Sequence, residues 1–369
     1  MAGAEVGCMI EAEAPPAPLR EVAVSAMAGY GRALLAAATA YPKARLIRGD
    51  FRLPSLDITV WFSSPRLAAL AERTFVTRAA GEAATHIDVY ALDPETATWE
   101  MPAMAKPEPG FSTRKLEQAL VGAGLRGFYH SELRSWQFFD VATATGVMSL
   151  SDELALPPWE LGSPLRLFLH WGAAAAGHRL THAATLGHAG CGVLIAAASG
   201  SGKSGTALAG VLHGLDSAGD DYVVVQRTEA AVFAYPAFAL FKQDREGLQR
   251  AGIAERFEDA PLNWHGKVEF DPAALTGRAL APRLEIVALL IPEVAHAART
   301  TFAPARADEA ALALAPSGVL QLPGDTQAGF HFLADLARRV PAFRLRLSED
   351  PAEIAAAIGT FLMEMGGER

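Results

Sequence analysis

The stretch Gly192-Val-Leu-Ile-Ala-Ala-Ala-Ser-Gly-Ser-Gly-Lys-Ser204 decides the fold of this chain. Its apolar start, Gly192–Ala196, predicts a buried strand, and helical spacing begins at Gly205, directly after the Gly-rich part. This order of strand, loop and helix is the context that a phosphate-binding P-loop requires. Small residues let backbone N–H groups converge on phosphate oxygens, and the next helix points its positive N-terminus at them.

The loop Ala197–Ser204 predicts which residues hold a nucleotide. Lys203 is expected to reach the β- and γ-phosphates, and Ser204 to offer its hydroxyl to Mg²⁺. The first position is Ala197 where such loops have Gly, which costs little if the backbone there keeps a negative φ. The alternative is a Gly-rich turn that binds no nucleotide. The other residues expected to surround the phosphates are Ala198, Ser199, Gly200, Ser201 and Gly202.

Composition excludes several classes of protein. The 369 residues are 51% hydrophobic and carry a net charge of −9, with no Lys/Arg-rich run, which argues against a nucleic-acid surface. Cys8 and Cys191 are too few for a disulfide framework or a zinc site. We find no signal peptide and no apolar run approaching 18 residues, so the sequence predicts a soluble cytoplasmic protein without membrane contact.

The chain is expected to have three parts. Residues 1–20 are predicted to be a loose tail, residues 21–150 an α+β domain with a possible part in substrate or partner recognition, and residues 151–369 the domain that holds the loop. A Pro-containing segment, 99–112, is predicted to be a loop. The predicted helices are 25–41, 65–73, 164–176, 204–214, 308–315, 327–339 and 351–363. The predicted strands are 57–62, 86–91, 127–130, 135–140, 146–150, 179–186, 192–196, 222–226, 284–291 and 343–347, with a hairpin through 231–235.

Two adjacent acids follow the loop. Asp220 and Asp221 come 17 and 18 residues after Lys203 and lead into an apolar strand that starts at Tyr222. Paired carboxylates at a strand edge are costly unless a cation lies beside them, and Mg²⁺ with ATP would supply that charge. One Asp would hold the metal, and the other would take the proton from an attacking hydroxyl. The alternative is a solvated turn, in which Asp is common.

One histidine precedes the loop in a suggestive position. His182 lies on the predicted strand 179–186, which is expected to pair with the loop strand and to bring the imidazole toward the Asp pair. There it would orient or modulate one Asp, because its charge changes near neutral pH. A lone His is more often structural, and we take that reading for His170, His178 and His188.

Together these features resemble the catalytic domain of HPr kinase/phosphorylase, which shares a P-loop fold with ATP-dependent phosphoenolpyruvate carboxykinases. The chain is also similar to HPr-kinase-related bacterial serine kinases, which include modifiers of lasso-peptide precursors, over about residues 125–350. The resemblance implies an α/β fold in which an HPr kinase/phosphoenolpyruvate carboxykinase-like P-loop core follows a smaller α+β domain. The stretches that carry it are Leu156–Arg166, Leu180–Ala184, Gly192–Ile195, Gly219–Val224, Ala313–Ser317 and Gln321–Pro323.

The resemblance also implies roles for individual residues. Asp221 would be the base on the acceptor hydroxyl, and Asp220 would bind the metal or pair with His182. Lys242 lies where these relatives tend to carry a Lys, and would neutralise phosphate charge; Lys267 is a weaker candidate, more simply read as a solvated residue. The implied catalytic set is Asp221, His182 and Lys203, with Ser204 and Asp220 as metal ligands.

The expected function is therefore an Mg²⁺–ATP-dependent kinase that phosphorylates a hydroxyl, and the expected acceptor is Ser in a peptide or protein. HPr kinases have Gly and Asp where this chain has Ala197 and Ala198, and their Glu-rich segment has no clear match here. HPr and the reverse, dephosphorylating reaction are accordingly not expected. The alternatives are a kinase for a small molecule such as free serine, and a non-catalytic nucleotide-binding sensor or assembly protein. Since HPr kinases are oligomers, a homo-oligomer is also possible.

Overall fold

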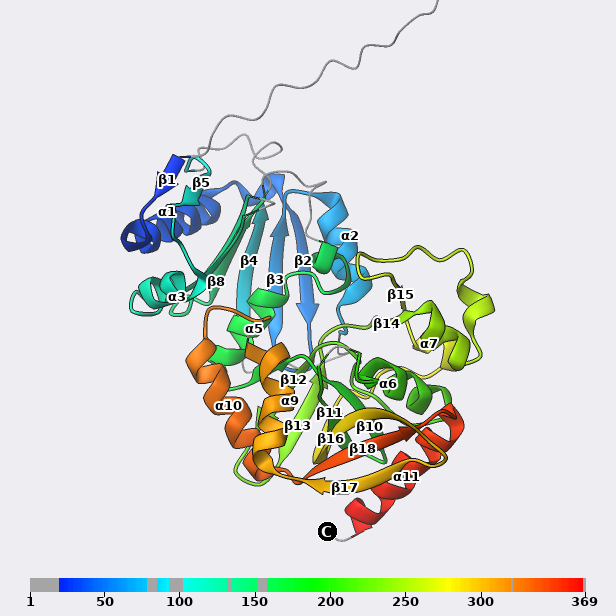
Figure 1. Ribbon diagram of the computed structural model, residues 1–369. Coiled ribbons are helices and arrows are strands. Elements are labelled where there is room, and N and C mark those ends of the chain that lie inside the picture. The colour runs from blue at the N-terminus through cyan, green and yellow to red at the C-terminus, as the bar shows by residue number, and fades with distance from the viewer. Residues whose placement is uncertain are drawn as a thin grey trace, which may run out of the picture.

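The chain forms a mixed α/β structure with two large sheets, as the computed structural model shows (Figure 1). Two small two-stranded sheets lie beside them. The mixed α/β class is the one that the sequence predicts. The structure describes residues 20–77, 85–92, 102–131, 134–150, 158–198, 200–319 and 321–367.

The first large sheet comes from the N-terminal part of the chain and has the order β2-β3-β4-β8-β7-β6. Strands β3, β4 and β8 run parallel to one another, and the remaining pairs are antiparallel. The predicted strands 57–62, 86–91, 127–130, 135–140 and 146–150 are confirmed within this sheet. Its strands are β2 (Ile47–Arg52), β3 (Asp57–Phe62), β4 (His86–Leu92), β6 (Leu125–His130), β7 (Ser135–Asp140) and β8 (Thr145–Ser149).

Helices cover both faces of this sheet. One face packs against α1 (Met27–Ala40) and α3 (Thr113–Val121), and the other against α2 (Pro65–Thr74) and α5 (Arg166–Ala175). The start of α2 follows from its sequence, because Ser64 accepts a hydrogen bond from the backbone N–H of Leu67 and a proline occupies the first turn. Helices therefore form where the residues at 25–41, 65–73 and 164–176 predict them.

The second large sheet contains eight strands, with β10-β11-β16-β13-β12-β9 in order, β18 beside β16, and β17 beside β18. Helices α6 (Lys203–Leu212) and α11 (Pro351–Gly367) pack on one face, and α9 (Ala307–Val319) and α10 (Thr326–Arg339) on the other. The strands are β9 (Arg179–Thr181), β10 (Ala184–His188), β11 (Cys191–Ile195), β12 (Val223–Arg227), β13 (Val232–Pro236), β16 (Leu284–Ala297), β17 (Thr301–Ala305) and β18 (Ala342–Ser348).

The prediction of one strand over 179–186 is wrong. The chain leaves the strand conformation at His182 and Ala183, which separate β9 from β10. Strand β9 pairs with β12, whereas β10 pairs with the loop strand β11. The strand partner therefore changes at His182, which an unbroken apolar pattern does not reveal.

Segment 99–112 is not entirely a loop. Strand β5 (Ala105–Pro107) lies within it and pairs in parallel with β1 (Arg20–Val22). The second small sheet joins β14 (Phe241–Asp244) to β15 (Lys267–Phe270), and the chain between them carries α7 (Arg245–Arg250). Short elements complete the fold: α4 (Pro158–Gly162), α8 (Ala273–Thr276) and 3₁₀ turns at Val24–Ala26, Lys43–Arg45 and Ala254–Phe257.

One apolar core extends from the first sheet to the second. Helix α5 supplies Phe168 and Trp171 to it, and the same cluster contains Val89 of β4 and Val224 of β12. The expected division at residue 150 stays a prediction, since α5 follows that point in sequence and packs on the sheet that precedes it. The expected tail 1–20 lies outside the described residues except for Arg20. Among the described helices, none is both long and apolar enough to cross a bilayer.

Phe168 provides a test of this shared core. Its ring is fully buried and lies edge-on to Trp171, with 5.5 Å between the ring centroids. Phe168→Ala should lower the free energy of unfolding by about 3–5 kcal/mol, because it leaves a cavity. Phe330→Ala is the matched control, since Phe330 is 54% exposed and its loss should change stability by less than about 0.5 kcal/mol. Equal midpoints of urea unfolding for the two variants would contradict this assignment of the core.

Candidate active site

The loop between β11 and α6 has the backbone shape that its glycines predict. Gly200 and Gly202 have φ values of +83° and +94°, a region that favours glycine. Ala197 and Ala198 keep negative φ, so the methyl groups at these positions impose no backbone strain. Ser199, also expected to contact phosphate, lies outside the described residues.

Three further contacts fix this loop. The hydroxyl of Ser201 donates to the carbonyl of Ala198 at 2.7 Å, which closes the turn. A Cβ atom at Gly202 would lie 2.7 Å from Leu347 Cδ1 of β18, so the close approach of the two segments also requires glycine there. The hydroxyl of Thr206 donates to the Gly202 carbonyl at 2.8 Å and ties the loop to the first turn of α6.

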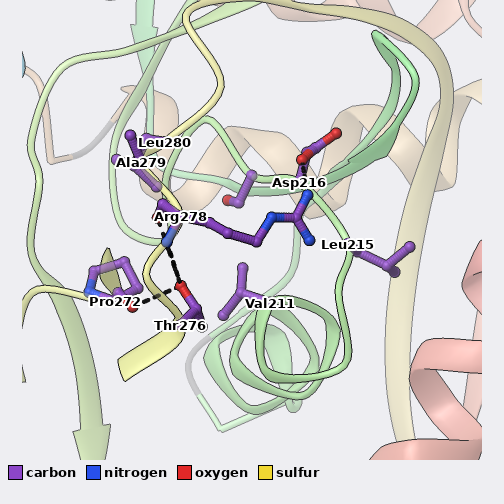
Figure 2. A pocket seen from close by; sticks show the side chains of 9 residues that line it. Val211, Leu215, Asp216, Pro272, Thr276, Arg278, Ala279 and Leu280 are labelled. Atoms are coloured by element: carbon purple, nitrogen blue, oxygen red, sulfur yellow. Dashed lines mark hydrogen bonds and ion pairs between the residues drawn. The ribbon is translucent and has the colours of Figure 1, made fainter. Parts of the chain in front are cut away.

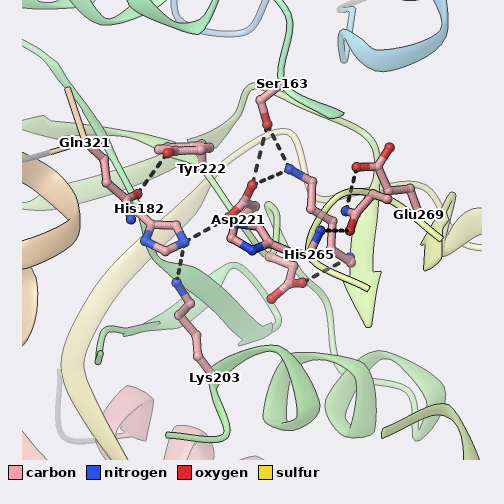
Figure 3. A network of polar contacts seen from close by, with 11 residues as sticks. Ser163, His182, Lys203, Asp221, Tyr222, His265, Glu269 and Gln321 are labelled. Carbon is pink, nitrogen blue, oxygen red and sulfur yellow. Dashed lines mark hydrogen bonds and ion pairs between the residues drawn. The ribbon is translucent and has the colours of Figure 1, made fainter. Parts of the chain in front are cut away.

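Lys203 begins α6, and its side chain points toward His182 (Figure 3). Its side chain is buried, and Nζ lies 2.8 Å from Nε2 of His182. The same Nε2 atom lies 2.9 Å from Oδ1 of Asp221. One nitrogen cannot accept a proton from Lys203 and donate one to Asp221 at once, so this arrangement satisfies one of the two contacts at a time.

Asp221 has further partners on its other oxygen. Lys242 of β14 donates to Oδ2 at 2.6 Å, and the hydroxyl of Ser163 lies 3.5 Å from the same atom. Lys242 also donates to Ser163 at 3.2 Å, so the three side chains form a closed group (Figure 3). Both Asp221 and Lys242 have less than a fifth of their side chains exposed, which strengthens the attraction between them.

Asp220 differs from its neighbour in its surroundings. It is 2% exposed, and Oδ2 accepts a weak hydrogen bond from the backbone N–H of Lys242 at 3.4 Å. The side chain of Ser204 lies close enough to help lower the pKa of this carboxyl. Its Oδ1 atom is buried and has no hydrogen-bond partner among the residues that the structure describes. A buried carboxylate oxygen without a partner is costly and fits a site for a cation.

Burial disfavours the charged form of both carboxyl groups, and the neighbouring charges decide whether the pKa of each one is raised or lowered. Burial raises the pKa of Asp220, although the charge of Lys203 opposes that rise. Burial alone would also raise the pKa of Asp221, but Lys242 and His182 hold it well below its ordinary value. Asp221 is therefore ionised at neutral pH, while ionisation of Asp220 is disfavoured in the ligand-free protein.

The pKa values of the two basic side chains, His182 and Lys203, are also lowered. Burial lowers the pKa of His182, with Asp221 acting in the opposite direction, so the imidazole is neutral at pH 7. Burial lowers the pKa of Lys203 as well, and the negative charges of Asp221 and Asp220 limit that effect. An anion bound beside Lys203 would favour its charged form.

Metal binding here would depend on few protein ligands. Across the described ranges, no group of three or more His, Cys, Asp or Glu side chains could hold an ion. Mg²⁺ is commonly held by one or two protein oxygens together with water and substrate phosphate. The carboxylate of Asp220 and the hydroxyl of Ser204 fit that pattern, because they lie together and one oxygen of Asp220 lacks a partner.

The structure thus brings the sequence-predicted residues together, though by a different route for His182. Asp221 is reached because β9 pairs with β12. The predicted pairing with the loop strand is confirmed for β10, which begins two residues after His182. Lys267 lies at the start of β15, where its charge helps to lower the pKa of Lys203. Sequence reasoning missed Ser163, whose only signal is a Gly-Ser-Pro turn pattern.

A pocket elsewhere has no part in this site (Figure 2). It lies beside Val211 and Leu215, at the C-terminal end of α6, whereas the loop lies at the N-terminal end. The guanidinium of Arg278 extends into it and binds Asp216 and the Gly214 carbonyl. The ion pair between Arg278 and Asp216 closes this pocket, and we assign the pocket a structural role.

Comparisons with known proteins find little. No protein-family model matches the chain, and no curated protein matches its sequence. Among solved structures, the Hpr(Ser) kinase/phosphatase from Coxiella burnetii is similar with a TM-score of 0.30 and 15% identity, over 51% of this chain and 99% of that one. At those values the likeness establishes neither a shared fold nor a shared activity.

The two acids should respond oppositely to the same substitution. Asp220→Asn should raise the melting temperature at pH 8. Because the pKa of Asp220 is raised in the folded protein, its charged form destabilises the fold once the pH has risen through that pKa, and the neutral amide removes this cost. Asp221→Asn should lower stability by about 2 kcal/mol, through loss of charge-assisted hydrogen bonds to Lys242 and His182.

The pH dependence should separate these effects further. The depressed pKa of Asp221 gives stability that is present above the unfolded value of about 3.9 and lost as pH falls through the folded value. The deficit of Asp221→Asn should therefore shrink in acid, and the gain of Asp220→Asn should vanish there. Thermal unfolding from pH 3 to 8 measures both, and destabilisation by both variants at pH 8 would contradict the assigned surroundings of Asp220.

Proposed function

We propose that this protein is a kinase that uses Mg²⁺ and ATP to phosphorylate a hydroxyl group. The observation that carries the proposal is the buried chain of contacts from Lys203 through His182 to Asp221, at the start of the helix that follows the Gly-rich loop. It puts a lysine ammonium group and a carboxylate on either side of one imidazole. A protein that only binds nucleotide does not need the carboxylate.

The phosphates would lie on the loop 197–204. Its positive-φ glycines and the N-terminus of α6 provide backbone donors and a favourable field for negative charge. Lys203 would leave His182 for a phosphate oxygen, and His182 Nε2 would then be able to donate to Asp221 alone. Phosphate binding would thereby end the competition between Lys203 and Asp221 for Nε2 of His182.

Mg²⁺ would be held by Asp220 and Ser204, where it would neutralise charge on the phosphates and supply the cation that Asp220 lacks. The carboxylate of Asp221 would orient the acceptor hydroxyl and receive its proton. As the hydroxyl oxygen bonds to the γ-phosphorus, the bond to the bridging oxygen breaks and ADP leaves with that electron pair. A low pKa at Asp221 suits a loose transition state, in which the proton moves late. Lys203 and Lys242 would stabilise charge on the transferring group.

The acceptor is a Ser hydroxyl of a peptide or protein in this proposal, on the sequence resemblance to serine kinases given above. Residues 21–150 would help to recognise it. A small hydroxyl compound such as free serine is the alternative acceptor. Labelled ATP supplied with Ser peptides and with free serine separates the two, and ATP binding without any labelled product would favour a non-catalytic sensor.

Lys203→Ala tests the phosphate-binding role. Removing the ammonium group should weaken binding of Mg²⁺–ADP at least about 10-fold and abolish phosphoryl transfer, because Lys203 supplies the charge-assisted contact to the phosphates in this proposal. Titration calorimetry and transfer of labelled γ-phosphate measure the two effects. Lys115→Ala is the control, since Lys115 is exposed on α3. Unchanged nucleotide affinity in Lys203→Ala would exclude the proposed site.

Asp221→Asn tests the role of the carboxylate. The amide keeps the shape and can still accept from Lys242, but it cannot take a proton. Transfer should fall at least about 100-fold while the Kd for Mg²⁺–ADP changes less than about threefold. The assay is run below the melting temperature of the variant. Full transfer activity in Asp221→Asn would show that another group acts on the hydroxyl.

A further inference from the structure

The turn before α5 holds a strained residue close to the site. Leu165 has a φ of +56°, in the left-handed region, and its side chain is 1% exposed. A bulky residue rarely adopts that conformation, and it persists there where its surroundings require it. Such strain often occurs at functional sites, so its local cause and effect are informative.

A buried carboxylate holds this turn in place. Oε2 of Glu160 accepts a hydrogen bond from the backbone N–H of Leu165 at 2.6 Å, and Glu160 itself is 1% exposed. Leu165 also packs into the core that joins the two sheets. The turn is therefore fixed from both of its ends.

The fixed turn presents Ser163 to the site. Ser163 is fully buried, accepts from Lys242 Nζ at 3.2 Å and lies within donating distance of Asp221 Oδ2. Gly162 makes this approach possible, because a Cβ there would lie 2.3 Å from Glu269 Oε1 and 2.6 Å from Lys242 Cε.

We propose that Ser163 is a positioning residue that holds Lys242 against Asp221, and that the turn from Glu160 to Leu165 exists to place its hydroxyl. The long side chain of Lys242 has many rotamers, and a second acceptor beside Asp221 selects the one that reaches the carboxylate. Ser163 does not touch substrate in this proposal; it acts through Lys242. The catalytic consequence rests on the proposed kinase function.

Kinetics of Ser163→Ala test the positioning role. Loss of the hydroxyl should lower kcat for phosphoryl transfer about 10-fold and leave the KM for ATP within twofold, because Lys203 and the loop are unaffected. Ser64→Ala is the matched control: Ser64 is equally buried and caps α2, so its loss lowers stability without changing kcat. Equal kcat in Ser163→Ala and wild type would overturn the proposal, as would a loss confined to KM.

An unfolding cycle tests the contact without any activity. We would measure urea unfolding of the ligand-free wild type, Ser163→Ala, Lys242→Met and the double variant. The effects on the unfolding equilibrium constant should be non-additive by at least fivefold, and additive effects would overturn the proposal. If wild type transfers no phosphate, the kinase function fails while the cycle still decides whether Ser163 and Lys242 are coupled.

Discussion

The site depends on the attraction between buried charges around Asp221. Lys242 and His182 contact its two oxygens, and Lys203 reaches the same imidazole. Charges taken out of water are costly, and only close partners with good geometry offset that cost. Each partner comes from a different segment: the short break after β9, the start of α6, and β14. The position of these segments therefore has to be accurate before the charges can stabilise one another.

The route of the chain through the second sheet provides that accuracy. A continuous strand over 179–186 would have left His182 beside the loop strand, as its sequence predicts. The break at His182 lets β9 pair with β12, so that the imidazole and Asp221 occupy neighbouring positions on the same edge. The loop strand β11 pairs with β10, which begins two residues after His182, and this pairing brings Lys203 to the same place.

Much of this arrangement is readable from the sequence, and the remainder has physical reasons for being hidden. Local patterns predict the loop, the acids at 220–221 and most helices, because spacing and capping are local properties. Patterns do not report strand partners, so the switch at His182 was missed. The strand β5 was missed because a short segment near prolines reads as loop. Ser163 was missed since its role depends on Lys242, which is 79 positions away.

Several groups of the site are arranged in ways that lower the stability of the folded protein. Asp220 keeps a buried oxygen without a partner in the described structure, His182 faces two groups that compete for one nitrogen, and Leu165 holds a strained conformation nearby. Local conflicts of this kind persist in natural proteins mainly at functional sites. A phosphate at Lys203 and a cation at Asp220 would resolve the first two together. The strain at Leu165 would remain, because it holds Ser163 in place whether or not a ligand is bound.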